Sequence, residues 1–151
     1  LNLNSRMVVS ANWDLPWSVT YTNTQSEFKQ SLNSSFELWG QVDAGDPVPY
    51  LPEQQLTLSL GLESSHWQFN LLANYVDEMP EAAGDGVALS GQTTDAHTTL
   101  DFSANYSMDD YGLVYLKIDN LLDDVALVSR RPFGARPGKP RALFVGYKYH
   151  F

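Results

Sequence analysis

Residues 141–151, at the end of the chain, restrict the possible folds more than any other stretch of the sequence. Every second side chain there is apolar or aromatic, and the side chains between them are small, polar or mixed. The apolar set consists of Leu143, Val145, Tyr147, Tyr149 and Phe151. Because side chains alternate between the two faces of a β-strand, this period of two predicts a strand with unlike faces. A strand that ends on exposed aromatic residues is unusual in a soluble domain and typical of the last strand of a transmembrane β-barrel.

Composition favours membrane-spanning strands over membrane-spanning helices. No apolar run approaches the ~20 residues that a transmembrane helix needs, whereas barrel strands are only half apolar. Eight tyrosines and four tryptophans are many for 151 residues, and both residue types concentrate at membrane–water interfaces. The net charge of −9 argues against a nucleic-acid partner. The absence of cysteine excludes disulfide frameworks, cysteine-based zinc sites and thiol nucleophiles from this sequence.

Six further segments show the same alternation and are predicted to be strands. Their apolar series run over residues 7–13, 17–21, 56–62, 67–75, 100–106 and 114–118. Short turns are predicted at residues 14–17, 63–66 and 107–110, and long loops at residues 30–53, 77–95 and 120–140. Connections that alternate between short and long are typical of outer-membrane barrels, which have short periplasmic turns and long extracellular loops. The sequence therefore predicts an all-β protein with seven antiparallel transmembrane strands. Trp13 and Trp17 flank the first predicted turn, where an interfacial aromatic girdle is expected.

The odd number of strands predicts that the chain is part of a larger barrel, since bacterial single-chain barrels have even strand counts. The last strand runs from a long loop to the periplasmic end, so the first of seven strands has to start at the outer end. We therefore interpret residues 1–151 as the C-terminal strands of a barrel whose earlier strands precede Leu1. No signal peptide is visible at the start of the sequence.

Several short motifs resemble those of TonB-dependent outer-membrane receptors. Asp119-Asn120-Leu121 resembles the family's Asn-Leu-Phe-Asp element, and Pro140-Arg141 resembles its Pro-Arg element. Residues 49–54 resemble its Pro-Glu-His motif. Tyr149 and Phe151 resemble the terminal signal that the barrel assembly machinery reads. Two positions depart from the family pattern, because Leu122 stands where phenylalanine is usual and Gln54 where histidine is usual. The resemblance extends over nearly the whole chain, and residues 129–141 are most similar to the group that includes ferric dicitrate receptors.

The resemblance implies a barrel of about twenty-two strands in the Gram-negative outer membrane, of which residues 1–151 would form the last seven. The plug domain and the earlier strands are absent from this sequence. The resemblance also implies energy-coupled uptake of a ferric siderophore or similar nutrient, driven by the TonB complex through the missing N-terminal region. Expected partners are outer-membrane lipid, lipopolysaccharide, the ferric chelate and the barrel assembly machinery, which would read Tyr147, Tyr149 and Phe151. No enzyme activity, catalytic residue, cofactor or metal site is expected.

A basic segment near the end of the chain is the candidate ligand site. It contains Arg130, Arg131, Arg136, Lys139 and Arg141, which are five of the nine basic residues. Prolines and glycines within the segment predict a shaped loop of limited flexibility. We interpret it as an extracellular patch in which Arg130, Arg131, Arg136 and Lys139 bind an anionic ferric chelate through charge-assisted hydrogen bonds. The alternative is structural: these cations pair with the acidic long loops or bind lipopolysaccharide phosphates.

Other interpretations of the sequence remain open. The alternation by itself also fits a small autonomous barrel or a soluble β-sandwich that acts as an adhesion or binding module. The acidic residues of the second long loop lack the regular spacing of a calcium site: Asp77, Glu78, Glu81 and Asp85. Polar residues of the inner face are expected to form cross-strand pairs: Asp101, Lys117, Asp119 and Lys148. The three histidines are scattered, and no nucleophile elbow is present.

Overall fold

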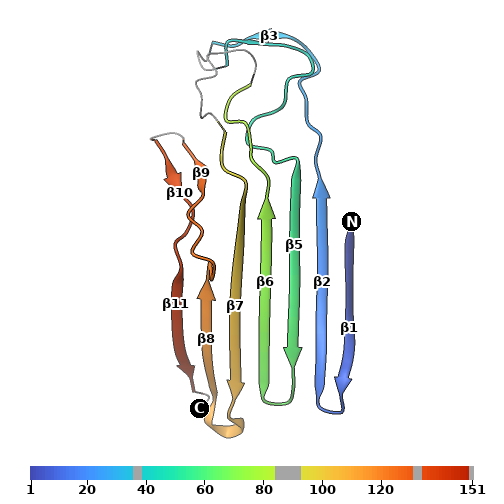
Figure 1. Ribbon diagram of the computed structural model, residues 1–151, viewed down its shortest axis with the longest axis vertical. Coiled ribbons are helices and arrows are strands. Elements are labelled where there is room, and N and C mark those ends of the chain that lie inside the picture. The colour runs from blue at the N-terminus through green and yellow to red at the C-terminus, as the bar shows by residue number, and fades with distance from the viewer. Residues whose placement is uncertain (36–38, 84–92, 131–133, 150–151) are drawn as a thin grey trace.

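The described part of the chain forms one large antiparallel sheet with loops at both ends (Figure 1). The computed structural model describes residues 1–35, 39–83, 93–130 and 134–149. The strands of the seven-stranded sheet are, in spatial order, β1 Asn2–Ser10, β2 Trp13–Asn23, β5 Gln54–Glu63, β6 Trp67–Val76, β7 His97–Ser107, β8 Leu113–Asp119 and β11 Ala142–Lys148. Each strand pairs with its neighbour in antiparallel orientation. The predicted all-β class and the seven antiparallel strands are therefore confirmed, and the sheet is open, with β1 and β11 at its edges.

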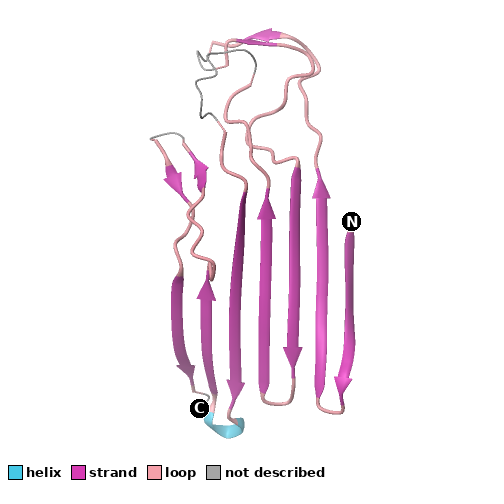
Figure 2. Cartoon of the chain, viewed as in Figure 1, coloured by secondary structure: helices cyan, strands magenta, loops and turns pink. Residues whose placement is uncertain are grey.

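Short and long connections lie at opposite ends of the sheet (Figure 1). At one end, short connections join β1 to β2, β5 to β6 and β7 to β8, and the last contains the 3₁₀-helix η1 Asp109–Tyr111 (Figure 2). At the other end, three loops span residues 24–53, 77–96 and 120–141, which we call the first, second and third long loops. No helix among the described residues has the length and apolar character needed to cross a membrane. The predicted asymmetry of the connections is confirmed.

Strand register sorts the side chains of the sheet into an apolar face and a polar face. Leu58 of β5 lies opposite both Val19 of β2 and Ala73 of β6, and the same face continues into the last strand. There, Leu143 and Val145 pair with apolar residues of β8 and are 65% and 71% exposed. The predicted alternation is confirmed over Ala142–Lys148, and residues 150 and 151, to which it was predicted to extend, lie outside the described residues. An apolar sheet face this exposed is suited to lipid rather than to water.

The polar face carries hydroxyl and amide side chains that bond across neighbouring strands. Thr57 Oγ1 donates to Asn74 Oδ1 at 3.0 Å, and Ser59 Oγ donates to Asn70 Oδ1 at 3.2 Å. The other two sheets of the described chain are two-stranded hairpins within the long loops, so they do not cover either face. A β-sandwich needs two packed sheets, and the sandwich alternative is therefore wrong for the described residues.

The first turn differs from the prediction at residues 14–17. The structure places the turn at Ala11 and Asn12, and Pro16 lies inside β2, opposite Arg6 of β1. Pairing of β2 with β5 skips Leu15 and Pro16, since proline lacks the N–H that a ladder requires. The prediction was wrong because a proline interrupts only the ladder toward which its missing N–H would point, while the other ladder continues.

Gly61 of β5 makes room for the Pro16 ring. A Cβ atom at Gly61 would lie 2.6 Å from Pro16 Cγ, well below van der Waals contact. We expect Gly61→Ala to lower the free energy of unfolding by about 1–2 kcal/mol, because the two strands would have to separate. Thermal unfolding of the purified protein measures this cost. In a Pro16→Ala background most of the penalty should vanish, and an equal penalty in both backgrounds would contradict the steric explanation.

A bulge in β1 alters the predicted distribution of side chains near the first turn. The register shifts between Val8 and Ser10, so that Ser10 lies directly opposite Trp13. The predicted alternation over residues 7–13 implies that Ser10 and Trp13 lie on opposite faces, and the structure contradicts this at Ser10. The extra residue of a bulge shifts the alternation by one, which a strict period of two does not anticipate.

An aromatic cluster lies near the short-turn end of the apolar face. Trp67 stacks on Phe69 with ring centroids 5.4 Å apart, Trp13 stacks on Phe69 at 6.4 Å, and Trp67 contacts Tyr106 at 4.5 Å. This arrangement matches an interfacial girdle, whose rings lie where the membrane meets water. Trp13 therefore has its predicted place. Trp17 was predicted to flank a turn, but it lies within β2.

Most buried side chains lie at the long-loop end rather than in the sheet, whose single layer leaves nearly all of its residues at least partly exposed. They include Val42, Pro52, Ala83, Ala126, Glu81, Thr94, Asn120 and, at the end of β8, Asp119. Two small hairpins help to form this region: β3 Leu32–Asn33 with β4 Gln41–Val42, and β9 Leu127–Ser129 with β10 Arg136–Pro137. Strands of two or three residues carry no readable period, so the sequence did not predict them.

Candidate functional site: the layer of long loops

The three long loops are joined to one another by hydrogen bonds. Tyr50 N of the first loop donates to Pro80 O of the second at 2.9 Å. Between the second and third loops, Asp95 N donates to Leu127 O at 2.8 Å, and Leu127 N donates to Asp95 Oδ2 at 2.7 Å. Because each loop is tied to its neighbour, the described parts of the loops form one connected layer over the end of the sheet.

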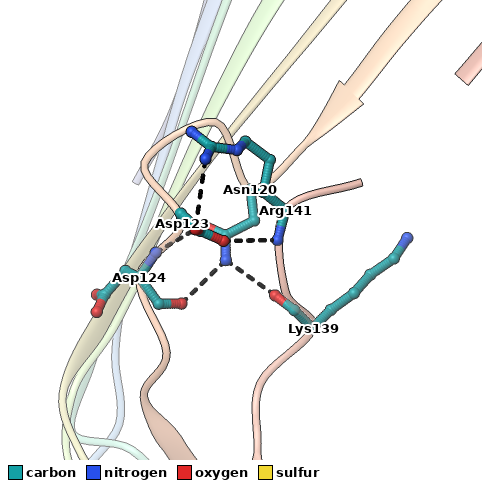
Figure 3. A network of polar contacts seen from close by, with 5 residues as sticks. All are labelled: Asn120, Asp123, Asp124, Lys139 and Arg141. Carbon is teal, nitrogen blue, oxygen red and sulfur yellow. Dashed lines mark hydrogen bonds and ion pairs between the residues drawn. The ribbon is translucent and has the colours of Figure 1, made fainter. Parts of the chain in front are cut away.

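Asn120, which follows β8, is the centre of a polar network (Figure 3). Its side-chain Nδ2 donates to the backbone oxygen of Asp124 at 2.9 Å and to that of Lys139 at 2.8 Å. Its backbone N donates to Asp101 Oδ1 of β7 at 2.8 Å. The residue is 2% exposed and has a φ of 49°, a left-handed conformation that asparagine tolerates better than most residues. One amide therefore ties the start of the third long loop to its end.

A second contact closes the same loop beside Asn120 (Figure 3). Arg141 N donates to Asp123 Oδ1 at 3.0 Å, and the Arg141 guanidinium lies 3.4 Å from Asp123 Oδ2. Both side chains of this ion pair are about half exposed. We call the group of Asn120, Asp123, Asp124, Lys139 and Arg141 the third-loop clamp.

Lys139 is neutralised by a carboxylate at the end of β8. Its ammonium group pairs with Asp119 Oδ2, while Lys117 Nζ lies 2.8 Å from Asp119 Oδ1, close enough for an ion pair but without hydrogen-bond geometry. The Asp119 side chain is 7% exposed. Both ammonium groups also lie over the Phe144 ring, at 5.5 and 5.9 Å from its centroid. Lys117 and Asp119 were predicted to form cross-strand pairs, but the two residues pair with each other along β8.

Arg130 is held by the second long loop. Its backbone N donates to Glu81 Oε1 at 2.8 Å, and its guanidinium Nη1 donates to the backbone oxygen of Thr93. Glu81 is 2% exposed, so its carboxylate is an interior contact between two loops rather than a solvated charge. An arginine has five N–H donors, and the one used here leaves others for a ligand.

Arg136 lies on β10, exposed, and makes no ion pair with any other described residue. Arg131 lies outside the described residues. The basic segment therefore divides into two parts: Lys139 and Arg141 are engaged with Asp119 and Asp123, whereas Arg130 and Arg136 retain donors.

The sequence did not reveal the role of Glu81, which was considered only as one acid of a loop. A single acidic residue gives no signal of burial, and its partner lies 49 positions away. Asp85, from the same set of acids, lies outside the described residues. Among the residues that the structure describes, no group of three or more histidine, aspartate or glutamate side chains is arranged to hold a metal ion.

The residues predicted to form the barrel-assembly signal lie at the end of the last strand. The Tyr147 hydroxyl donates to the backbone oxygen of Tyr111, and the rings of Tyr147 and Tyr149 are 6.4 Å apart. Phe151 lies outside the described residues. Recognition of these side chains by the assembly machinery stays a prediction.

Comparison with known proteins decides the family. The family model described as "TonB dependent receptor-like, beta-barrel" matches residues 1–121. The chain belongs to this family. TonB-dependent receptors are receptors of the outer membrane and not a class of enzyme. The predicted resemblance is confirmed.

A solved structure is similar to this receptor chain in fold. It is the ferric-catecholate import receptor Fiu of Escherichia coli K12, in its closed form, with a TM-score of 0.67 and 18% sequence identity. The match covers 95% of this chain and 19% of that receptor, so the chain spans about a fifth of its length. No curated protein sequence matches the chain. At this identity the likeness concerns the fold, including the seven-stranded antiparallel sheet.

Proposed function

We propose that this chain forms the C-terminal strands of a TonB-dependent receptor that takes up a ferric siderophore or a similar anionic nutrient by energy-coupled transport. One observation carries the proposal: a chain of this receptor family gathers its three long loops into one connected layer at a single end of the strands. The fold likeness to a ferric-catecholate import receptor supports a ferric chelate as the class of ligand. The remaining strands, the plug and the TonB-binding segment would come from residues outside this sequence.

Arg130 and Arg136 are the residues that we propose for contact with the ligand. Both keep guanidinium donors that the described chain does not use, and the two lie on or beside the β9–β10 hairpin of the third long loop. Guanidinium groups suit anionic oxygen ligands, because they offer paired donors and a fixed positive charge. Arg131 belongs to the same proposal from its place in the sequence. Lys139 has a lesser part, since Asp119 neutralises its charge.

Uptake by the full-length receptor tests the transport function. A Gram-negative host that lacks its own ferric siderophore receptors would express the receptor during iron starvation, with ferric citrate or a ferric tris-catecholate as the iron source. We expect growth with at least one of these chelates, and only when TonB is present. Growth that does not need TonB, or no growth with either chelate at normal surface levels of the receptor, would contradict the proposal.

Replacing Arg136 by alanine should weaken capture of the chelate that supports growth. Loss of one charge-assisted contact is expected to raise the apparent KM for uptake roughly tenfold, with little change in the maximal rate. The difference should shrink at high salt, because exposed charges are screened. Lys29→Ala, which removes an exposed lysine of the first long loop, is the matched control. An unchanged KM in the Arg136 variant would remove this residue from the site, and defective binding of lipopolysaccharide instead would favour the phosphate alternative.

A further inference from the structure

The third-loop clamp determines where the β9–β10 hairpin leaves the sheet. Asn120 Nδ2 binds backbone oxygens on both limbs of the loop, and one of these, Lys139 O, lies 19 positions away. The β9–β10 hairpin lies at the end of these limbs away from the sheet (Figure 1), with Arg136 on β10 and Arg130 directly after β9. A loop of 22 residues (120–141) is thereby reduced to a short arm with a closed base.

We propose that Asn120 is a positioning residue, which orients Arg130 and Arg136 for capture of an anionic chelate. The ligand part of this inference rests on the function proposed above. Asn120 is the stronger of the two contacts that close the clamp, because its amide bonds are 2.8 and 2.9 Å long and almost fully buried. The contact between Arg141 and Asp123 consists of a backbone hydrogen bond of 3.0 Å and an ion pair of 3.4 Å, and both are exposed, so solvent weakens them.

The chemistry of the position explains why asparagine is suited to it. The φ of 49° favours asparagine, aspartate or glycine. Of these three, only asparagine has an NH₂ group that can donate to two carbonyl oxygens at once. Aspartate has nearly the same shape and tolerates the same backbone, but it would direct a carboxylate oxygen at both carbonyls. The Asn120→Asp variant therefore removes the two donors without changing volume.

The far side of the arm is docked on the second long loop. Leu127 exchanges two hydrogen bonds with Asp95, and Arg130 is bound by Glu81 and Thr93. Without the Asn120 amide bonds, the arm is held by these contacts, by the exposed contact of Arg141 with Asp123 and by the ion pair of Lys139 with Asp119. The arm then samples additional orientations. The apparent affinity for a ligand falls in proportion to the fraction of molecules in which the arm has the orientation that binds the ligand. A competent fraction of one tenth raises the apparent KM about tenfold.

The test compares the full-length receptor with its Asn120→Asp variant in two measurements. The first is hydrogen exchange, followed by mass spectrometry, in peptides that cover residues 126–130 and 134–138. The second is uptake of iron-labelled ferric citrate and of an iron-labelled tris-catecholate chelate. We expect faster exchange in these peptides and about a tenfold higher KM, with an unchanged maximal rate and normal surface levels. Asn12→Asp, at an exposed turn on the opposite end of the sheet, should change neither quantity.

The two measurements separate the outcomes. Unchanged hydrogen exchange in these peptides overturns the inference. Faster hydrogen exchange with an unchanged KM also overturns it, because Asn120 would then contribute only to the stability of the loop. If the wild-type receptor takes up neither chelate, the proposed function fails, and exchange alone decides whether Asn120 orients the arm. If Asn120→Asp does not reach the outer membrane, Asn120→Gly replaces it, since glycine accepts the backbone conformation, removes the donors and adds no charge.

Discussion

Replacing Gly112 by alanine is expected to lower the free energy of unfolding of the receptor barrel by at least about 3 kcal/mol. Gly112 connects η1 to β8 and has a φ of 105° with a ψ of −150°, a region that only glycine adopts readily. A Cβ atom there would lie 2.1 Å from the backbone oxygen of Lys148, at the end of β11. The side chain would therefore force apart the last two strands of the sheet.

Gly134 provides a matched control for this prediction. Its φ is also 105°, but among the described residues, its chain neighbours aside, no atom lies within 4 Å of a Cβ built on it. Gly134→Ala thus measures backbone strain by itself, and Gly112→Ala measures strain together with the collision. Thermal unfolding and the amount of folded receptor in outer membranes are the measurements. Equal effects of the two substitutions would show that the contact with Lys148 does not matter.

Replacing Glu81 by alanine is expected to destabilise the contact between the second and third long loops by about 2–3 kcal/mol. The substitution leaves the backbone N–H of Arg130 without its acceptor, which costs about 1–3 kcal/mol for a buried donor. It also leaves a cavity where a side chain that is 2% exposed had been packed. Faster hydrogen exchange at residues 127–130 would report this local opening. The hydrogen-exchange rates of the backbone amides in β5 and β6 should stay unchanged.

Glu81→Gln is the control for this second prediction. Glutamine keeps the carbonyl oxygen that can accept from Arg130 N, so most of the stability should return. Ligand uptake should follow the same order, because Arg130 is oriented through this contact. If the glutamine variant is as unstable as the alanine variant, the negative charge of Glu81 rather than its acceptor oxygen holds the two loops together.

The sheet was predictable from the sequence because its signals are local. A period of two in residues 56–62 and 67–75 was sufficient to predict β5 and β6, and their pairing follows from the short turn between them. The prediction failed at Pro16 and at the bulge near Ser10, where one residue changes the ladder or the alternation. Both errors are displacements of a few residues, and neither changed the order of the strands.

The candidate site was predictable only as a set of residue types. The basic segment was visible in the sequence. Which of its residues are paired with carboxylates was not visible, because the carboxylates that neutralise Lys139 and Arg141 lie 20 and 18 positions away. The contact between Arg130 and Glu81 spans 49 positions. Such pairs depend on the path of three loops, which no local period specifies.

The amino-acid sequence by itself determined that this chain is a meander of two-faced strands with an aromatic last strand and all its long connections on one side. These properties follow from side-chain alternation and from the lengths of the connections, both of which act between near neighbours. The tertiary structure alone decided which charges remain available at the long-loop end. Asp119 and Asp123 engage two of the basic residues, and Asn120 closes the loop that presents the others. The physical reason is that hydrogen bonds and ion pairs form where distant segments meet, and only the folded loops bring those segments together.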